Sequence, residues 1–172
     1  MSEIFAGSQE QHEMGEGARV LHELERSGEY LFHGSPDGTI AELEPHQGMM
    51  TVNGIEQEDG LLPGIATTPF ADLAIFRALT RDLYGHTSFG QNDDGTLSME
   101  ASQSVLDTVK GQIAHVYVFP RAQFVPRHGD EREMEWRSEA RQKPIQVVTV
   151  TDRDLPSDIK LKEKAPDADE TA

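Results

Sequence analysis

The spacing of apolar positions along the chain predicts two helices and two long strands. Apolar residues recur at helical spacing over residues 16–27 and 69–84. Continuous runs of β-branched and aromatic residues cover 113–119 and 145–150, which is typical of strands. Because these elements do not follow a regular strand–helix–strand repeat, the pattern predicts a single α+β domain.

Weaker signals account for part of the remaining chain. Short strands are expected at 30–32 and 64–68, and a short helix at 104–110. Residues 44–63 and 85–104 are polar and rich in turn-forming residues, so we expect long loops there.

Changes in composition predict the domain limits. Residues 1–14 are polar without a clear period and are interpreted as a leader. Residues 15–156 form the expected domain. Residues 157–172 are charged and rich in Pro, Ala and Asp, so a disordered acidic tail is expected.

The composition narrows the possible functions. The 172 residues include 31 acidic and 15 basic side chains, and the net charge is −16, which argues against binding of bulk nucleic acid. There is no cysteine, and the seven histidines lack metal-ligand spacing, so we expect no metal. Neither a membrane-spanning run nor a signal-peptide pattern is present, so we expect a cytoplasmic protein without a membrane partner.

The first candidate site is His33-Gly34-Ser35, at the end of the predicted strand that starts at residue 30. A histidine at a strand end can present its ring to a cleft, and the glycine allows a ligand to approach the backbone closely. Ser35 adds a hydroxyl group. An ordinary strand end before a Ser-Pro turn is the alternative interpretation.

The second candidate is the junction of the strand at 64–68 with the following helix, where Thr67 and Thr68 lie. A strand that breaks into a helix leaves free N–H groups at the helix start, and these can bind an anion. Phe76 lies on the helix, where a core position is the alternative.

The third candidate is an acidic segment that contains Glu133, Glu135 and Glu139 around the single tryptophan, Trp136. If this segment is extended, Trp136 and Glu135 point to opposite faces. The alternative is a solvated charged loop.

Taken in order, these three segments resemble the ADP-ribosyltransferase fold family, over roughly residues 30–155. That family includes poly-ADP-ribose polymerases, diphtheria-type toxins and RNA 2′-phosphotransferases. The resemblance implies an α+β fold of short mixed or antiparallel strands with a few helices and long loops. It also implies NAD as the substrate and nucleotide partner.

The resemblance assigns roles to individual residues. His33 would bond a ribose hydroxyl of NAD, and Gly34 would hold the nicotinamide amide through its backbone. Phe76 would lie beside the nicotinamide ring, while Ala66 stands where the family has a second aromatic residue. The full set of expected nucleotide-binding residues is His33, Gly34, Ser35, Thr67, Thr68 and Phe76.

The catalytic residues expected from the resemblance are Glu135, with Glu139 as the second choice, and His33. Loss of nicotinamide from NAD passes through an oxocarbenium-like sugar, as in glycoside cleavage. A carboxylate beside that sugar stabilises the developing positive charge.

Three functions stay open at this point. The first is transfer of ADP-ribose to an unknown acceptor, or cleavage of NAD. The second is a catalytically inactive nucleotide- or protein-binding module of the same fold, favoured by Ala66. The third is an RNA 2′-phosphotransferase-like activity, for which Arg77, Arg81 and Arg137 would supply positive charge.

Overall fold

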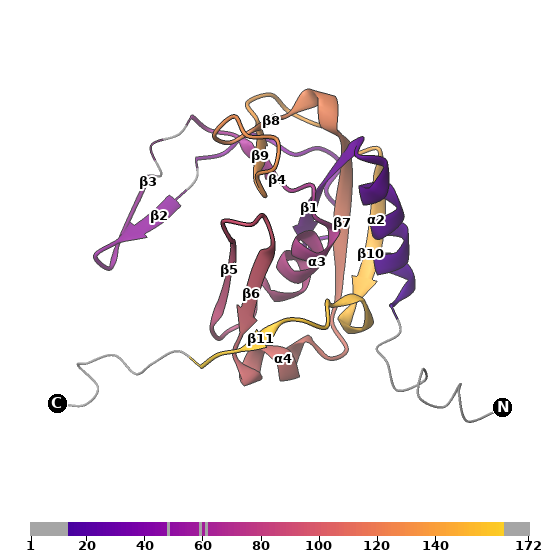
Figure 1. The fold of residues 1–172 in the computed structure, drawn as a ribbon, viewed down its shortest axis with the longest axis vertical. Coiled ribbons are helices and arrows are strands. Elements are labelled where there is room, and N and C mark those ends of the chain that lie inside the picture. The colour runs from indigo at the N-terminus through magenta and orange to yellow at the C-terminus, as the bar shows by residue number, and fades with distance from the viewer. Residues whose placement is uncertain (1–13, 48, 59, 61, 164–172) are drawn as a thin grey trace.

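The computed structural model describes residues 14–47, 49–58, 60 and 62–163, and its architecture is α+β. A three-stranded antiparallel sheet lies at its centre, in the order β1-β7-β10 (Figure 1). Its strands are β1 (Tyr30–Ser35), β7 (Ile113–Pro120) and β10 (Gln146–Thr151). The two long strands predicted from the apolar runs are thereby confirmed, and the middle strand β7 is buried over most of its length.

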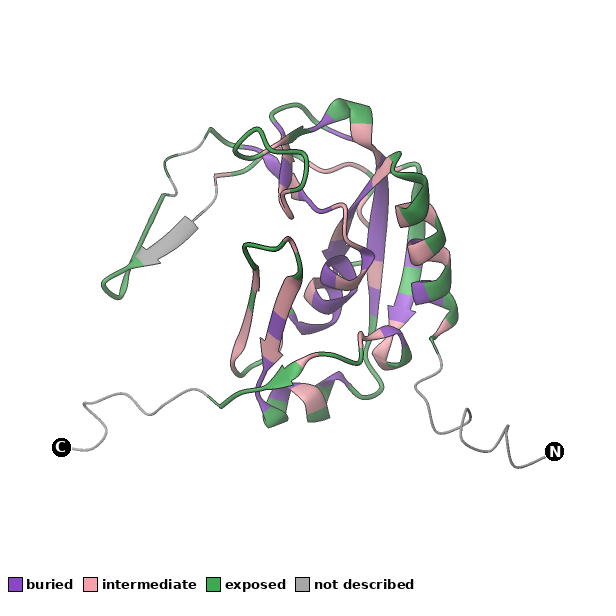
Figure 2. Cartoon of the chain, viewed as in Figure 1, coloured by how far each residue is buried: buried purple, intermediate pink, exposed green. Residues whose placement is uncertain are grey.

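Three α-helices lie in the described part of the chain: α2 (Glu16–Ser27), α3 (Ala71–Thr80) and α4 (Gln103–Val109). Helix α2 packs against β10 and buries one face, whereas α3 packs against β1 and β7 and is buried on almost all sides (Figure 2). This difference follows from the sequence, because α2 alternates apolar and charged residues and α3 is mostly apolar. The helix predicted at 16–27 is confirmed, and the helix expected at 69–84 is shorter.

Two further three-stranded sheets flank the central one. In the first, all pairs are antiparallel, in the order β4-β9-β8. In the second, β5 and β6 form a hairpin and β11 lies parallel to β6. Their strands are β4 (Ile65–Thr67), β9 (Trp136–Ser138), β8 (Val125–Pro126), β5 (Thr87–Gln91), β6 (Leu97–Ala101) and β11 (Lys160–Leu161). Single 3-10 turns, η1 (Arg121–Gln123) and η2 (Asp152–Asp154), follow β7 and β10.

The expectation of long loops at 44–63 and 85–104 is wrong, because each segment contains a β-hairpin. The first joins β2 (Met49–Val52) to β3 (Ile55–Glu58) and projects from the body (Figure 1). Its turn residues, Asn53 and Gly54, have φ angles of 52° and 78°, and Asn-Gly is a strong signal for this turn. The second hairpin is β5–β6. Both were missed because their short strands lie among many turn-forming and acidic residues.

The domain extends beyond residue 156, into the segment where a disordered tail was expected. Strand β11 pairs with β6, and the Lys162 N–H donates to the Ala101 carbonyl oxygen at 3.0 Å. The Glu163 carboxylate accepts a hydrogen bond from the Gln103 N–H at 2.9 Å, at the start of α4. Of the expected leader and tail, residues 1–13 and 164–172 lie outside the described residues.

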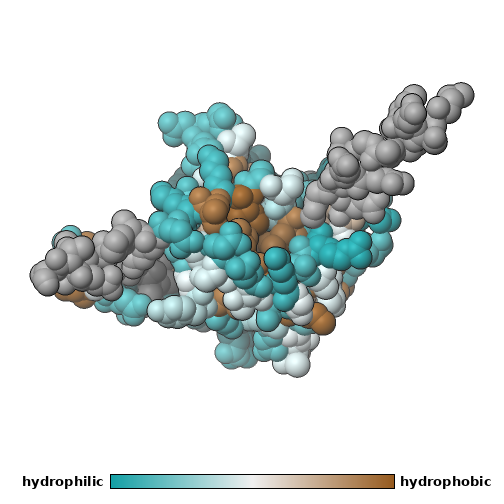
Figure 3. All heavy atoms as spheres, turned by 90° about the horizontal axis from the view of Figure 1, so that it is seen from below, coloured by the Kyte–Doolittle hydropathy of each residue, from teal (hydrophilic) through white to brown (hydrophobic). Residues whose placement is uncertain are grey.

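Two apolar clusters hold the structure together. The larger lies between the helices and one face of the central sheet, and the smaller lies on its other face around Tyr117 and Trp136. Seen from below, one face of the molecule is largely hydrophilic around a central group of hydrophobic residues (Figure 3). No helix within the described residues has the length and apolar character needed to cross a membrane.

Candidate functional site

Strands β1 and β4 meet at one pair of backbone hydrogen bonds and then separate. The Phe32 N–H donates to the Thr68 oxygen at 2.8 Å, and the Thr68 N–H donates to the Phe32 oxygen at 2.9 Å. A continued antiparallel ladder would next pair Gly34 with Ala66. Instead, the His33 ring donates from Nδ1 to the Ala66 carbonyl oxygen at 2.9 Å. The imidazole therefore occupies the acceptor that would have extended the ladder.

A pocket of about 370 Å³ lies where the two strands separate. Strand β1 contributes His33 and Gly34 to its lining, and α3 contributes Arg77 and Arg81. Glu135, from the segment before β9, also lines it. The pocket thus brings together the first and third candidate segments, which lie about 100 residues apart in the sequence.

Gly34 lines this pocket, and on that side no described residue pairs with its backbone N–H and C=O. Phe32 directs its N–H and C=O toward β4, and residues two apart in an antiparallel strand direct these groups to the same side. The N–H and C=O of Gly34 therefore point away from β7, and β4 does not pair with them.

The absence of a side chain at Gly34 also has a packing reason. A Cβ atom at this position would lie 2.1 Å from the Ala74 carbonyl oxygen and 2.7 Å from the Ala78 nitrogen. Glycine therefore lets α3 pack directly on β1. From the sequence, we expected the glycine to let a ligand approach the backbone. The structure adds a second reason for glycine here, because α3 also approaches the backbone closely.

His33 is neutral at physiological pH. Burial is the largest effect and lowers its pKa to about 4, the hydrogen bond to Ala66 opposes this, and the positive charges of Arg81 and Arg77 lower the pKa further. Because Nδ1 carries the proton that bonds to Ala66, Nε2 is left as a hydrogen-bond acceptor.

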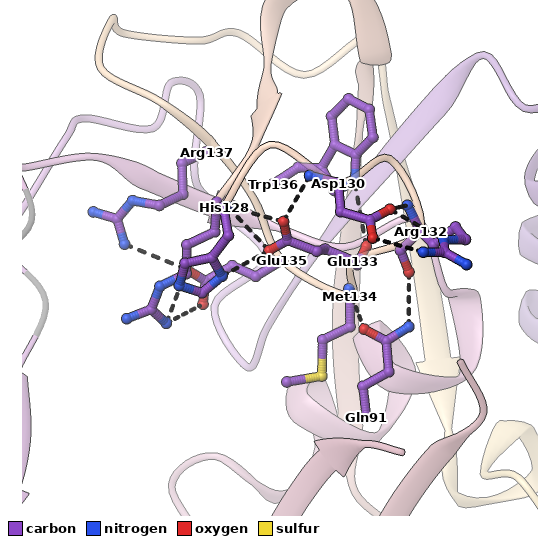
Figure 4. A network of polar contacts seen from close by, with 10 residues as sticks. Gln91, His128, Asp130, Arg132, Glu133, Met134, Glu135, Trp136 and Arg137 are labelled. Carbon is purple, nitrogen blue, oxygen red and sulfur yellow. Dashed lines mark hydrogen bonds and ion pairs between the residues drawn. The ribbon is translucent and has the colours of Figure 1, made fainter. Parts of the chain in front are cut away.

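Glu135 lies within ion-pair distance of two arginines, and Figure 4 labels it together with one of them, Arg137. Its Oε2 atom is 3.4 Å from Arg127 Nη1 and 3.5 Å from Arg137 Nη1. Oε2 is nevertheless buried without a hydrogen bond from any described residue. Its two arginine contacts balance part of the charge of this oxygen, and its capacity to accept a hydrogen bond is left for a ligand.

The β5–β6 hairpin contributes an aromatic wall. Phe89 lines the pocket, and the Arg77 guanidinium carbon lies 4.7 Å from its ring centroid. The Gln91 side chain accepts a hydrogen bond from the Met134 N–H at 3.0 Å and donates to the Arg132 carbonyl oxygen at 2.7 Å (Figure 4). These bonds fix the hairpin to the segment that carries Glu135.

Several predicted site residues have other tasks in the structure. Ser35 is buried outside the pocket lining and accepts a hydrogen bond from the Asp37 N–H at 3.1 Å. Phe76 is fully buried in the larger apolar cluster and does not line the pocket, so it is not placed to stack on a ligand there. Thr67 and Thr68 do line the pocket. The Thr67 hydroxyl, however, donates to the Trp136 carbonyl oxygen, and the Thr68 hydroxyl accepts from the Phe70 N–H.

The three candidate glutamates lie in different environments. Glu139 is exposed and outside the pocket lining. Glu133 accepts hydrogen bonds from the backbone N–H groups of His128 and Asp130, so it organises a turn (Figure 4). Only Glu135 of the three lines the pocket.

Sequence reasoning missed several lining residues, and His46 and Phe89 show why. His46 reaches the pocket because its backbone exchanges hydrogen bonds with Gly64, which no local pattern indicates. Phe89 was hidden in the segment interpreted as a loop. Residues 87–91, Thr-Ser-Phe-Gly-Gln, do not alternate apolar and polar side chains, so no local pattern identified this strand.

No three histidine, aspartate or glutamate side chains of the described residues converge as a metal site requires. Comparisons of the chain with protein-family models, with curated proteins and with solved structures give no match. Functional assignment therefore depends on the geometry of this pocket.

Proposed function

We propose that the protein has an ADP-ribosyltransferase-like fold and binds NAD in the pocket between β1 and β4. We further propose that it cleaves the bond between the ribose and the nicotinamide of NAD. The observation that carries the proposal is the pair of free backbone groups on Gly34. A primary carboxamide has one carbonyl acceptor and an NH₂ donor, so it can bond to the N–H and C=O of a single residue. Nicotinamide carries such a group.

His33 supports the same orientation of the substrate. With Nδ1 bonded to Ala66, Nε2 can accept a hydrogen bond from a ribose hydroxyl next to the nicotinamide. Because burial keeps the imidazole neutral, it adds no positive charge where the sugar itself becomes positive.

Glu135 supplies the negative charge that the reaction needs. As the bond from the ribose to nicotinamide breaks, its electron pair leaves with the nicotinamide nitrogen and the sugar becomes oxocarbenium-like. The Glu135 carboxylate stabilises that charge and orients the attacking group. The nucleophile then bonds to the sugar carbon and loses its proton to a base or to water.

Release of nicotinamide from NAD, with candidate acceptors present, tests this proposal. Glu135→Gln should abolish release while leaving the affinity for NAD within a few-fold, because the carboxylate acts mainly in the transition state. Glu139→Gln is the matched control, since this glutamate is exposed outside the pocket. Loss of release only in Glu139→Gln, or release unchanged in both variants, would contradict the role of Glu135.

A binding module without catalysis is the second candidate function, and the arginine pairing of Glu135 favours it. Arg127 and Arg137 neutralise part of the charge that the reaction would use. This candidate predicts saturable binding of NAD with no release of nicotinamide from the wild-type protein. Absence of any NAD binding at millimolar concentration would exclude NAD cleavage and an NAD-binding module, and would leave only a module that binds a protein or another nucleotide.

A further inference from the structure

The side-chain amide of Gln91 joins the β5–β6 hairpin to the backbone directly before Glu135. Its Nε2 atom donates to the Arg132 carbonyl oxygen at 2.7 Å, and its Oε1 atom accepts from the Met134 N–H at 3.0 Å (Figure 4). A primary amide can donate and accept at the same time, so one side chain satisfies both a backbone acceptor and a backbone donor. The segment that leads into Glu135 is thereby held by a residue 43 positions earlier in the chain.

The hairpin itself fixes this amide from the other side. Nε2 also donates to the Gly95 carbonyl oxygen at 3.1 Å, in the turn between β5 and β6. Because a primary amide has two N–H donors, the bonds to Gly95 and Arg132 use both of them. The side chain is therefore oriented by its own hairpin, and it meets the acidic segment with little rotamer freedom left to lose.

The same face of β5 also carries a wall of the pocket. Phe89 and Gln91 are two residues apart on one strand, so their side chains point to the same side. Phe89 lines the pocket, while Gln91 reaches the segment before β9. The position of Glu135 is thus set relative to the aromatic wall that a bound ligand would contact.

A second contact holds the backbone of Glu135 on its other side. The Arg127 N–H, directly after β8, donates to the Glu135 carbonyl oxygen at 3.0 Å. With the Met134 N–H bonded to Gln91, the chain is restrained immediately before and immediately after the Cα atom of Glu135. These two restraints fix the direction in which the Glu135 side chain leaves the backbone.

We infer that Gln91 is the positioning residue for the Glu135 carboxylate. The inference rests on the proposed function and deepens it, because it assigns to β5 the alignment of the carboxylate with the reacting sugar. A charge that stabilises a transition state must already be in place when the reaction begins. Displacement of this carboxylate by a fraction of an ångström should therefore slow the reaction more than it weakens the binding of NAD.

Steady-state release of nicotinamide from NAD by Gln91→Leu tests the inference. Leucine removes both hydrogen bonds to the acidic segment, so kcat should fall about tenfold or more while KM for NAD stays within about threefold. Gln91→Met removes the same bonds and keeps an unbranched side chain, so it should give the same result if leucine disturbs folding. Gln57→Leu is the matched control, since Gln57 is exposed on β3, and its kcat should equal that of the wild type.

The carbon NMR signal of the Glu135 carboxyl group provides a readout that needs no catalysis. The signal is assigned by its disappearance in Glu135→Gln. It should move in Gln91→Leu and Gln91→Met and stay in place in Gln57→Leu. The signal of Glu139, which is exposed outside the pocket, should stay in place in all three variants. A general loss of stability would not move one carboxyl signal and leave the other unchanged.

An unmoved Glu135 signal in both Gln91 variants would overturn the positioning role. So would a wild-type kcat in both, or a raised KM with kcat unchanged, since Gln91 would then act on binding alone. A moved Glu135 signal, in a protein whose wild type releases no nicotinamide, would support the positioning role and contradict the proposed NAD cleavage alone.

Discussion

At the scale of single residues, His33 shows how one side chain both opens the pocket and sets its chemistry. Its ring takes the Ala66 carbonyl oxygen that would have paired with the next residue of β1. The cost is a buried imidazole that resists protonation.

This burial predicts a specific pH dependence of stability. The pKa of His33 falls from 6.5 to about 4 on folding, so the unfolded chain binds more protons between these two values. The free energy of unfolding should therefore decrease as the pH falls through this window, by at most about 3 kcal/mol from His33. Above pH 6.5 the ring is neutral in both states and this effect is absent.

Denaturant unfolding of the wild type and of His33→Gln at neutral pH and at about pH 4.5 measures the effect. The wild type should lose more stability between the two conditions than the variant, because glutamine does not titrate. An identical loss in the two proteins would show that His33 is protonated as easily in the folded state as in the unfolded state.

Only some of the residues expected from the sequence for the site lie together in the structure. His33, Gly34 and Glu135 do line one pocket, because their strand positions fix the direction of the backbone and side chains. Ser35 and Phe76 do not, since one closes a turn and the other fills the core. A sequence gives the residue type at each position, but which side of a helix faces a pocket depends on packing.

At the scale of elements, α3 depends on another helix for its N-terminal cap. Its own N-cap residue, Phe70, has no side chain that can accept a hydrogen bond. Glu25 of α2 does so instead, because its carboxylate accepts a hydrogen bond from the Ala71 N–H at 2.5 Å. His22 of α2 also contacts Asp72, with 2.8 Å between Nε2 and Oδ1.

Loss of this cap should destabilise the helix that carries both pocket arginines. Glu25→Ala should lower the free energy of unfolding by about 0.5–2 kcal/mol, as for other helix N-caps. Glu23→Ala provides the control, since Glu23 is exposed on the same helix. Chemical denaturation of both variants measures the difference, and equal stabilities would show that the cap contributes nothing.

Whether an element could be predicted depends on whether its own residues or residues distant in the sequence stabilise it. Helix α2 and strands β7 and β10 follow from the spacing of their own residues, so they were found nearly to the residue. The β5–β6 hairpin was missed because its short strands lie among turn-forming residues and are held by partners elsewhere, such as Gln91 with Met134. The cap of α3 joins residues 46 positions apart, and no local pattern indicates it.

At the scale of the whole molecule, the C-terminal part of the domain adds an edge strand to the sheet that carries Phe89. Strand β11 adds to β6, and Lys162 and Glu163 extend the contact to α4. The sequence placed the end of the domain at residue 156, because strand β11 is too short to show a periodic pattern.

A chain that ends after residue 156 should therefore be less stable than one that ends after residue 163. Each backbone hydrogen bond lost costs on the order of 1 kcal/mol, and a domain of this size loses about 2–4 °C in Tm per kcal/mol. Thermal unfolding of the two truncated chains measures the difference. The same Tm for both would show that β11 contributes no stability.

The position of Trp136 has a consequence for spectroscopy. It is the single tryptophan of the chain and directly follows Glu135. Its indole is almost fully buried beneath Arg121, with the guanidinium carbon 4.2 Å from the ring, and its Nε1–H donates to the Glu133 carbonyl oxygen at 3.2 Å. Tryptophan fluorescence of the unlabelled protein therefore comes from one known point beside the pocket. A ligand that displaces Glu135 should change this emission directly, and the absence of cysteine leaves the chain free for one introduced thiol as an energy-transfer acceptor.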